Sequence, residues 1–319
     1  MRKPGVYMKP RFTDPRDKRL VRMIRTAKRS RTNSVNIIGI PFDGAVLGRK
    51  GAKEGPAAIR HVMTGFSNYN LELGVGLEGA RISDLGDISL GTEDVVRAHR
   101  MIESEVFQSL EASSLLVILG GDNSISLPAL TALSRRFGKI GLVVVDSHFD
   151  LRGKIGGKPT SGSSYGLAIE TLQGLDPHRV VEIGIHGFLN SKSYAEEAQK
   201  QGVRVYTAKE VREAGPEAVA REAYATAAEG ADAVYLSVDL DAVDLAWVSG
   251  VSAPSAGGVS ASELLGIVHA ITKMSEVKCM DLVELAPSLD STGRSAVVAA
   301  TALTYAVAGF VSRRQKASR

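Results

Sequence analysis

The middle of the chain contains an apolar run that leads directly into a polar cluster, Ile140-Gly141-Leu142-Val143-Val144-Val145-Asp146-Ser147-His148-Phe149-Asp150. Similar short runs, rich in β-branched residues, recur from residue 35 onward and alternate with stretches of helical spacing. They cover residues 35–40, 115–119, 140–145, 180–185, 203–206, 233–238 and 278–285. This alternation predicts a parallel sheet, and almost continuously apolar runs are typical of strands covered by helices on both faces. We therefore expect a three-layer α/β/α fold with a mainly parallel central sheet.

The composition predicts one large domain preceded by a basic arm. Of the 319 residues, 44% are hydrophobic, which suffices for a large core, and no repeat or long linker divides the chain after its start. The net charge of +4 arises mainly from cations near the start of the chain. We therefore divide the chain into a basic N-terminal arm, residues 1–34, and a single α/β domain, residues 35–319. We interpret the arm as a solvated or subunit-contacting helix and expect no nucleic-acid partner.

Cysteine usage and hydropathy indicate where the protein resides. Cys279 is the only cysteine, which excludes an internal disulfide framework and a thiolate metal cage and favours a reducing compartment. We find no apolar run of the length, about 18 to 20 residues, that a membrane span requires, and no signal-peptide pattern. We expect a cytoplasmic protein with no membrane partner.

Three of the predicted strands end in clusters of oxygen-bearing side chains. The run 115–119 leads into Gly120-Gly121-Asp122-Asn123-Ser124, the run 140–145 into Asp146 through Asp150, and the run 233–238 into Asp239-Leu240-Asp241. Ligands of parallel sheets gather beyond the carboxyl ends of the strands, and spacings of two place alternate residues on one side of an extended backbone. Several carboxylates with one imidazole suit Mn²⁺, Mg²⁺ or a related cation. The sequence therefore predicts a metal site that includes Asp146, His148, Asp150, Asp239 and Asp241.

The order of these motifs resembles that of the ureohydrolase family of arginases and agmatinases, and the resemblance covers nearly everything after residue 35. It also includes Gly250-Val251-Ser252-Ala253-Pro254 and Asp281-Leu282-Val283-Glu284. The resemblance implies an arginase-like fold and two divalent ions, Mn²⁺ in our prediction. One ion would be held by Asn123, Asp146, Asp150 and Asp239, and the other by Asp146, His148, Asp239 and Asp241. It also implies that Asp150 takes part in catalysis and that Glu284 pairs with a cationic amidine or guanidine.

Two departures from the arginase pattern resemble the formimidoylglutamase branch of the family. Asn123 stands where arginases and agmatinases have a metal-binding histidine, and the loop 159–165 lacks their catalytic histidine. Ser161 or Tyr165 occupies that place, so we predict catalytic or substrate contacts for Ser161 and a substrate contact for Tyr165. Arg152, two residues beyond Asp150, is predicted to clamp a substrate carboxylate bidentately.

These features favour one activity over two alternatives. The first hypothesis is hydrolysis of N-formimidoyl-L-glutamate to glutamate and formamide. The second is a guanidino-specific ureohydrolase, such as an agmatinase, guanidinobutyrase or arginase, which releases urea. The third is a non-catalytic homologue that keeps its metal, although four mutually repelling carboxylates have little physical use without catalysis. The family resemblance also implies a homo-oligomer, either a trimer or a hexamer.

Overall fold

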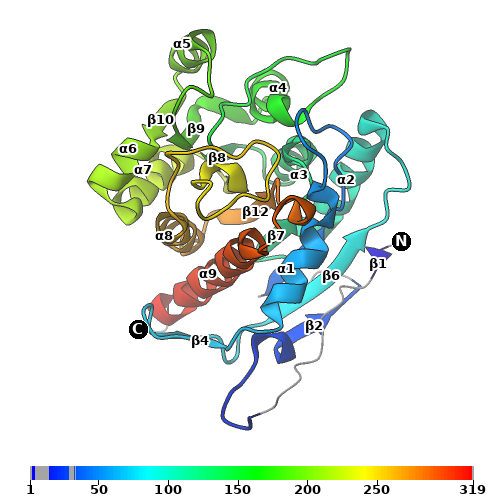
Figure 1. Ribbon diagram of the computed structural model, residues 1–319, viewed down its shortest axis with the longest axis vertical. Helices are drawn as coiled ribbons and strands as arrows, with labels where there is room; N and C mark the ends of the chain where they lie inside the picture. Colours follow the sequence, from blue (N-terminus) through cyan, green and yellow to red (C-terminus); the bar gives the residue numbers. More distant parts are fainter. Residues whose placement is uncertain (1, 4–13, 29–31, 33, 318–319) are drawn as a thin grey trace.

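A ten-stranded sheet forms the middle layer of the fold, as the computed structural model shows for residues 2–3, 14–28, 32 and 34–317 (Figure 1). The strand order is β1-β6-β3-β7-β12-β11-β8-β9-β10, with β2 also paired to β6. All pairs are parallel except β1 with β6. The strands are β1 (Arg2–Lys3), β2 (Ile24–Thr26), β3 (Val35–Gly39), β6 (Ile82–Ile88), β7 (Leu115–Leu119), β8 (Ile140–Val145), β9 (Leu175–Ile185), β10 (Arg204–Thr207), β11 (Ala233–Asp239) and β12 (Val277–Val283). A separate two-stranded hairpin joins β4 (Tyr69–Asn70) to β5 (Val75–Gly76).

Helices cover both faces of this sheet and give two hydrophobic cores. One core includes buried side chains of α1 (Gly55–Met63), α6 (Ala208–Ala214), α7 (Pro216–Ala228), α8 (Ala261–Thr272) and α9 (Arg294–Ala317). The other includes those of α2 (Val95–Leu110), α3 (Ser126–Phe137), α4 (Ser164–Thr171) and α5 (Lys192–Gln201). Short 3₁₀ turns η1 to η6 cover Leu20–Arg22, Ala52–Glu54, Asn123–Ile125, Ser161–Ser163, Leu240–Ala242 and Pro287–Leu289. The prediction of a three-layer α/β/α fold with a mainly parallel sheet is confirmed.

Strand β6 is the one long strand that the sequence pattern did not predict. Its apolar residues are interrupted by Asp84 and Asp87, so it lacks the continuous apolar run of the predicted strands. Both carboxylates pair with the buried Arg60 of α1: Nε and Nη2 contact Asp84 at 2.7 and 3.0 Å, and Nη1 contacts Asp87 at 2.5 Å. Because the guanidinium offers several donors in one plane, it satisfies both carboxylates inside the fold.

The arm departs from the predicted helix where the structure describes it. Residues 14–28 contain the single turn η1 and the strand β2, which pairs with β6 through Ile24, Arg25 and Thr26. Part of the arm is therefore joined to the central sheet. Lys9, Arg11, Arg29 and Arg31 lie outside the described residues.

Helix α9 corrects the expectation that no apolar run is long enough to cross a membrane. The segment Arg294–Arg313 is long and apolar enough to cross a membrane by length and composition alone. However, 72% of its most apolar stretch is buried inside the fold. It contributes Ala299, Leu303 and Val307 to the core. Its apolar character therefore comes from packing within the domain.

Candidate metal centre

Four neighbouring strands bring the predicted site residues to one edge of the sheet. Strands β7, β12, β11 and β8 are adjacent in that order, and all run parallel. Asn123 follows β7, Glu284 follows β12, Asp239 ends β11, and Asp146 follows β8. Since carboxyl ends of parallel strands meet at one edge, residues more than 150 positions apart in the sequence converge there.

The backbone around these residues is less regular than the spacing suggested. Strand β8 ends at Val145, so Asp146, His148 and Asp150 lie beyond it, and Asp241 lies in η5. Asp150 (φ 47°) and Glu284 (φ 66°) are the two non-glycine residues with positive φ in the described part of the chain. Left-handed backbone is costly for such residues and is typical of functional sites. The turns, rather than strand alternation, aim these two carboxylates at the site.

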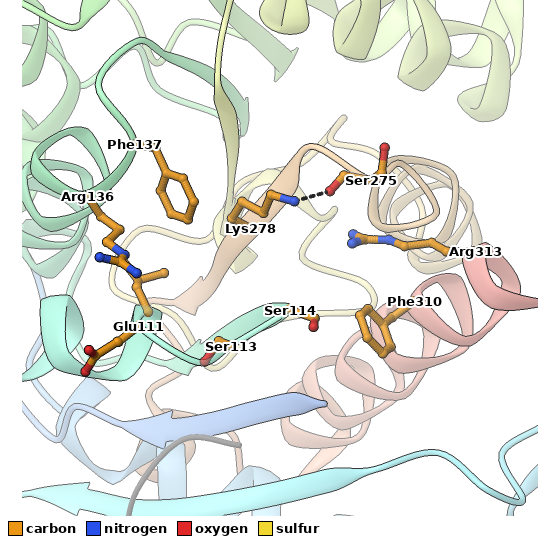
Figure 2. Close-up of a pocket in the computed structure, with 10 residues that line it drawn as sticks. Glu111, Ser113, Ser114, Arg136, Phe137, Ser275, Lys278, Phe310 and Arg313 are labelled. Carbon is orange, nitrogen blue, oxygen red and sulfur yellow. Dashed lines mark hydrogen bonds between the residues drawn. The ribbon is translucent and has the colours of Figure 1, made fainter. Parts of the chain in front are cut away.

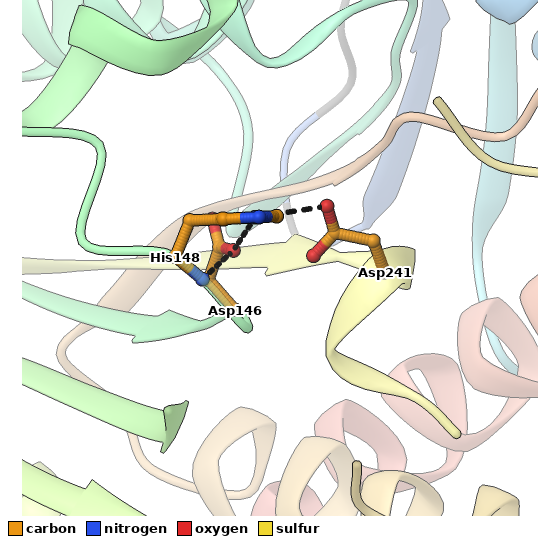
Figure 3. Close-up of side chains that lie close together, drawn as sticks. All are labelled: Asp146, His148 and Asp241. Carbon is orange, nitrogen blue, oxygen red and sulfur yellow. Dashed lines mark hydrogen bonds and ion pairs between the residues drawn. The ribbon is translucent and has the colours of Figure 1, made fainter. Parts of the chain in front are cut away.

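Asp146, His148 and Asp241 form the tightest cluster of possible metal ligands (Figure 3). One ligand atom from each lies within 4.8 Å of the others. His148 Nδ1 is 3.1 Å from Asp241 Oδ2 and 3.6 Å from Asp146 Oδ1. Ser147 Oγ donates to Asp241 Oδ1 at 2.7 Å and so fixes that carboxylate from behind. No feature of the sequence pattern predicts this role for Ser147.

The electrostatics of the cluster fit a divalent cation. Burial and then neighbouring carboxylates raise the pKa of Asp146 and Asp239 well above the ordinary value, and burial raises that of Asp150 to about 7. Burial alone would lower the pKa of His148, but the hydrogen bond and charge of Asp241, with further carboxylates, raise it to about 9. Asp146 Oδ2 and Glu284 Oε2 are buried without a hydrogen-bond partner among the described residues. Carboxyl groups in this state are stabilised either by protons or by a cation, and a donor set of oxygens and one imidazole suits a hard to borderline metal.

Asn123 is held from several sides. Its side-chain Nδ2 donates to Asp150 Oδ2 at 2.5 Å, and its backbone N–H donates to Glu284 Oε1 at 2.8 Å. Its amide oxygen, the predicted ligand atom, accepts from Ser126 and Tyr165 and faces away from Asp150. Close packing also explains the preceding Gly121, because a Cβ there would lie 1.7 Å from the carbonyl oxygen of Phe42.

A small cavity of about 140 Å³ opens over this cluster. Its lining includes eight predicted residues: Asn123, His148, Asp150, Arg152, Ser161, Asp239, Asp241 and Glu284. Asp146 does not line the cavity; it is fully buried and forms the tight cluster with His148 and Asp241. Tyr165 is fully buried and does not line the cavity, so its predicted substrate contact has no support in this geometry.

The rim of the cavity contains residues for which sequence analysis assigned no role. Leu47 and Ser252 line it, and the backbone N–H of Leu47 donates to Ser161 Oγ at 3.1 Å. Arg49 donates to the carbonyl oxygens of Val251 and Ser252 at 2.7 and 3.2 Å, which ties two rim loops together. The motif containing Ser252 was part of the family resemblance, but its position over the cavity depends on long-range loop contacts.

A larger cavity of about 380 Å³ lies at the opposite edge of the sheet, where β12 begins (Figure 2). Lys278 Nζ donates there to the carbonyl oxygen of Ser275 at 2.8 Å. Arg313 donates to those of Thr272 and Val277 at 2.7 and 3.0 Å. These cations satisfy backbone carbonyls at element ends, so their presence has a structural explanation. The metal-binding chemistry belongs to the smaller cavity.

Comparison with known proteins agrees with this geometry. Residues 33–309 match the sequence pattern of the arginase family. A formimidoylglutamase of Halalkalibacterium halodurans is 36% identical over 263 residues, covering 82% of each chain. One from Halobacterium salinarum is 35% identical over 305 residues, covering 94% of this chain and 96% of the relative. The crystal structure of Trypanosoma cruzi formiminoglutamase with Mn²⁺ superposes with a TM-score of 0.86 at 32% identity, covering 93% of this chain and 99% of that one.

Proposed function

The chain belongs to the arginase family, and on that premise we propose that it hydrolyses N-formimidoyl-L-glutamate to L-glutamate and formamide, using two Mn²⁺ ions. It is a hydrolase of C–N bonds in linear amidines. The observation that carries the choice of substrate is the grouping of three features in one cavity. These are the carboxylate and imidazole cluster, the buried Glu284 and the cationic Arg152.

The metal-binding role falls to side chains with the appropriate donors. We propose that Asp146 and Asp239 would be ligands of both ions, that Asp150 and Asn123 would complete one site, and that His148 and Asp241 would complete the other. When bound, such a pair of ions supplies a water of lowered pKa for attack on the electron-poor amidine carbon. The protein prepares the site by holding the carboxylates close together against their mutual repulsion.

Glu284 is suited to bind the amidine group. Its Oε1 is fixed by the backbone N–H of Asn123 at 2.8 Å, while its buried Oε2 has no hydrogen-bond partner in the described part of the chain. Burial, and then the charge of Asp122, raise the pKa of Glu284 well above its ordinary value. A cationic amidine offers both the missing donor and the missing charge, and its planar form suits bidentate pairing.

Arg152 and Ser161 complete the proposed substrate contacts. Arg152 is exposed at the cavity, and its guanidinium carbon lies 5.4 Å from the ring centroid of Tyr194. This aromatic contact limits the positions of the guanidinium without using a carboxylate partner. Arg152 therefore remains available to bind a carboxylate of the substrate, while Ser161 offers its hydroxyl from the adjoining wall.

The direct test is product analysis with Mn²⁺-loaded protein. Release of formamide and glutamate from N-formimidoyl-L-glutamate, without urea from guanidines, would support the proposal. Urea release from agmatine, guanidinobutyrate or arginine at a higher kcat/KM would instead identify a guanidino-specific ureohydrolase. Metal binding without turnover of any amidine or guanidine would identify a non-catalytic homologue.

We also propose a cytoplasmic homo-oligomer, a trimer or hexamer, with no membrane or nucleic-acid partner. The proposal rests on the family resemblance and on the single cysteine, Cys279, which is free and buried. Light scattering on the purified protein measures the subunit number directly. A monomeric mass at micromolar concentration would contradict the oligomer.

A further inference from the structure

A closed network of buried polar side chains lies behind Asn123. Ser126 Oγ is 2.9 Å from Asn123 Oδ1 and 2.6 Å from Asp281 Oδ2. Tyr165 OH is 3.1 Å from Asn123 Oδ1 and 2.9 Å from Ser237 Oγ, which is 2.7 Å from Asp281 Oδ1. None of these five side chains is more than 1% exposed. Five elements, η3, α3, α4, β11 and β12, thus meet in one ring of hydrogen bonds.

The number of protons in this ring does not match the number of contacts. The five contacts all join two oxygen atoms, and the three hydroxyl groups supply one proton each. Asp281, as a carboxylate, supplies none, and its two oxygens also accept from Tyr235 OH at 2.7 Å and from the backbone N–H of Val238 at 3.2 Å. Two of the five contacts therefore have no proton. Unsatisfied buried oxygen pairs are costly.

Rotation of the Asn123 amide by half a turn removes the mismatch. Its two N–H groups then donate to Ser126 Oγ and Tyr165 OH, Ser126 donates to Asp281, and Tyr165 donates through Ser237 to Asp281. Five protons now serve five contacts. The amide oxygen turns toward Asp150 Oδ2, from which the amide nitrogen is separated by 2.5 Å before rotation. Two oxygens at such a separation need a positive charge between or beside them, either a cation or a proton.

We infer that Ser126, Tyr165, Ser237 and Asp281 are positioning residues that turn the amide oxygen of Asn123 toward the metal site when a cation is bound. With the amide nitrogen toward Asp150, the ring lacks two protons. With the amide oxygen turned toward a bound cation, the ring is complete. The network thus couples metal occupancy to the orientation of one amide. This inference rests on the proposed function, because it assumes a metal beside Asp150.

Two buried tyrosines provide a matched test. Tyr165 and Tyr235 are both fully buried, but Tyr165 is a member of the ring and contacts Asn123, whereas Tyr235 donates to Asp281 from outside it. Calorimetric titration of Mn²⁺ into metal-free protein measures the affinity of each site without turnover. We expect Tyr165→Phe to weaken one of two Mn²⁺ sites about tenfold, or about 1.4 kcal/mol. Tyr235→Phe should match the unmodified protein within about twofold, although both variants lose a buried hydrogen bond.

A second variant separates orientation from general destabilisation. In an Asn123→Ala background no amide remains to be oriented, so adding Tyr165→Phe should cause no further loss of Mn²⁺ affinity. Ser126→Ala should behave like Tyr165→Phe and keeps the inference testable if the tyrosine variant fails to fold. Unchanged Mn²⁺ binding in Tyr165→Phe, or an equal loss in Tyr235→Phe, would overturn the inference and leave the proposed function intact. Failure of the unmodified protein to bind Mn²⁺ would overturn both.

Discussion

Individual residues decide which substrate this family member can accept. Arg152 is the one Lys or Arg among the described residues that line the site cavity. The other charged groups there are His148 and carboxylates, which suit metal ions and an amidine. A carboxylate-bearing substrate therefore has one obvious partner, and its removal tests the substrate class.

We predict that Arg152→Ala lowers kcat/KM for N-formimidoyl-L-glutamate by roughly ten- to hundredfold, because a charge-assisted hydrogen bond contributes about 1.5 to 3 kcal/mol. An amidine that lacks the carboxylate should react equally with both proteins. Lys154→Ala is the matched control, since Lys154 is an exposed cation on the same loop that does not line the cavity. Steady-state kinetics with both substrates measure these effects. Equal losses on both substrates would show that Arg152 supports the metal loop instead.

Asp146 and Asp239 are predicted to matter through the metal. Asp146→Ala or Asp239→Ala should abolish activity and remove the rise in melting temperature that Mn²⁺ causes, because a ligand that binds only the folded state stabilises it by mass action. Asp232→Ala, an exposed carboxylate before β11, is the control. Two tightly bound ions in either site variant would refute the binuclear assignment.

The sequence predicted the members of the site better than their orientation. Asp146, His148 and Asp241 were identifiable because polar residues follow apolar strands at short spacing. The direction of the Asn123 amide depends on Ser126 and Tyr165, which come from α3 and α4. Local spacing carries no information about such contacts between separate elements.

At the scale of elements, strands with only apolar residues could be predicted from the sequence, and a strand with buried ionic residues could not. Apolar strands such as β7 and β8 were predicted because every residue faces a core. Strand β6 was missed because Asp84 looks like a loop residue until Arg60, 24 positions earlier, is placed beside it. A second buried carboxylate, Asp290, lies just before α9 and accepts hydrogen bonds from Ser295 at the start of this helix.

Asp290 accepts hydrogen bonds from the backbone N–H and side chains of both Thr292 and Ser295, at 2.6 to 2.9 Å. Burial alone would raise its pKa, but these bonds hold it well below the ordinary value. A lowered pKa in the folded state stabilises the protein above the unfolded pKa, about 3.9, and that contribution is lost as the pH falls through the folded pKa. We therefore predict that Asp290→Asn costs about 1 to 3 kcal/mol at pH 7.

Urea unfolding at pH 7 and pH 3 measures the predicted difference. The gap between the unmodified protein and Asp290→Asn should narrow at the lower pH, because the unfolded chain takes up a proton at Asp290 below its pKa of about 3.9, while the folded chain keeps the carboxylate ionised. Asp94→Asn is a useful comparison, since Asp94 caps α2 from an exposed position and should cause a smaller loss. A gap of equal size at both pH values would mean that the charge of Asp290 is unimportant.

At the scale of the whole molecule, the fold holds a group of repelling carboxylates at one edge of its sheet. The hydrophobic cores on the two faces supply the stability that this arrangement reduces. The sequence showed this architecture through the apolar strands, and it showed the carboxylates through the motifs between them. It could not show how far burial raises their pKa values, because that depends on the packed structure.

Those raised values predict how stability changes with pH in the metal-free protein. Asp146, Asp239 and Glu284 have pKa values well above ordinary, and Asp150 has one of about 7. A carboxyl group with a raised folded pKa stabilises the protein below the unfolded pKa, near 4, and this contribution is lost as the pH rises through the folded pKa. The pKa of His148 is raised from its ordinary value of 6.5 to about 9. Its stabilising contribution is therefore also lost as the pH rises, between about 6.5 and 9. The pKa of Asp241 is lowered, so its contribution to stability is lost as the pH falls. That loss occurs in the acid range, at lower pH than the other losses.

The melting temperature in a chelator should therefore fall as the pH rises from 5 to 8. Saturating Mn²⁺ should raise the melting temperature by a larger amount at higher pH, because fewer protons must leave the ligands when the metal binds. Thermal unfolding across this range, with chelator or with Mn²⁺, measures both trends. The variant Asp146→Asn with Asp239→Asn removes two of the titrating groups and should flatten the chelator curve. A level chelator curve in the unmodified protein would mean that the buried carboxylates do not retain protons. In that case the fold would tolerate several ionised carboxylates close together in the absence of metal. Their repulsion would then be no argument for metal ions at this site.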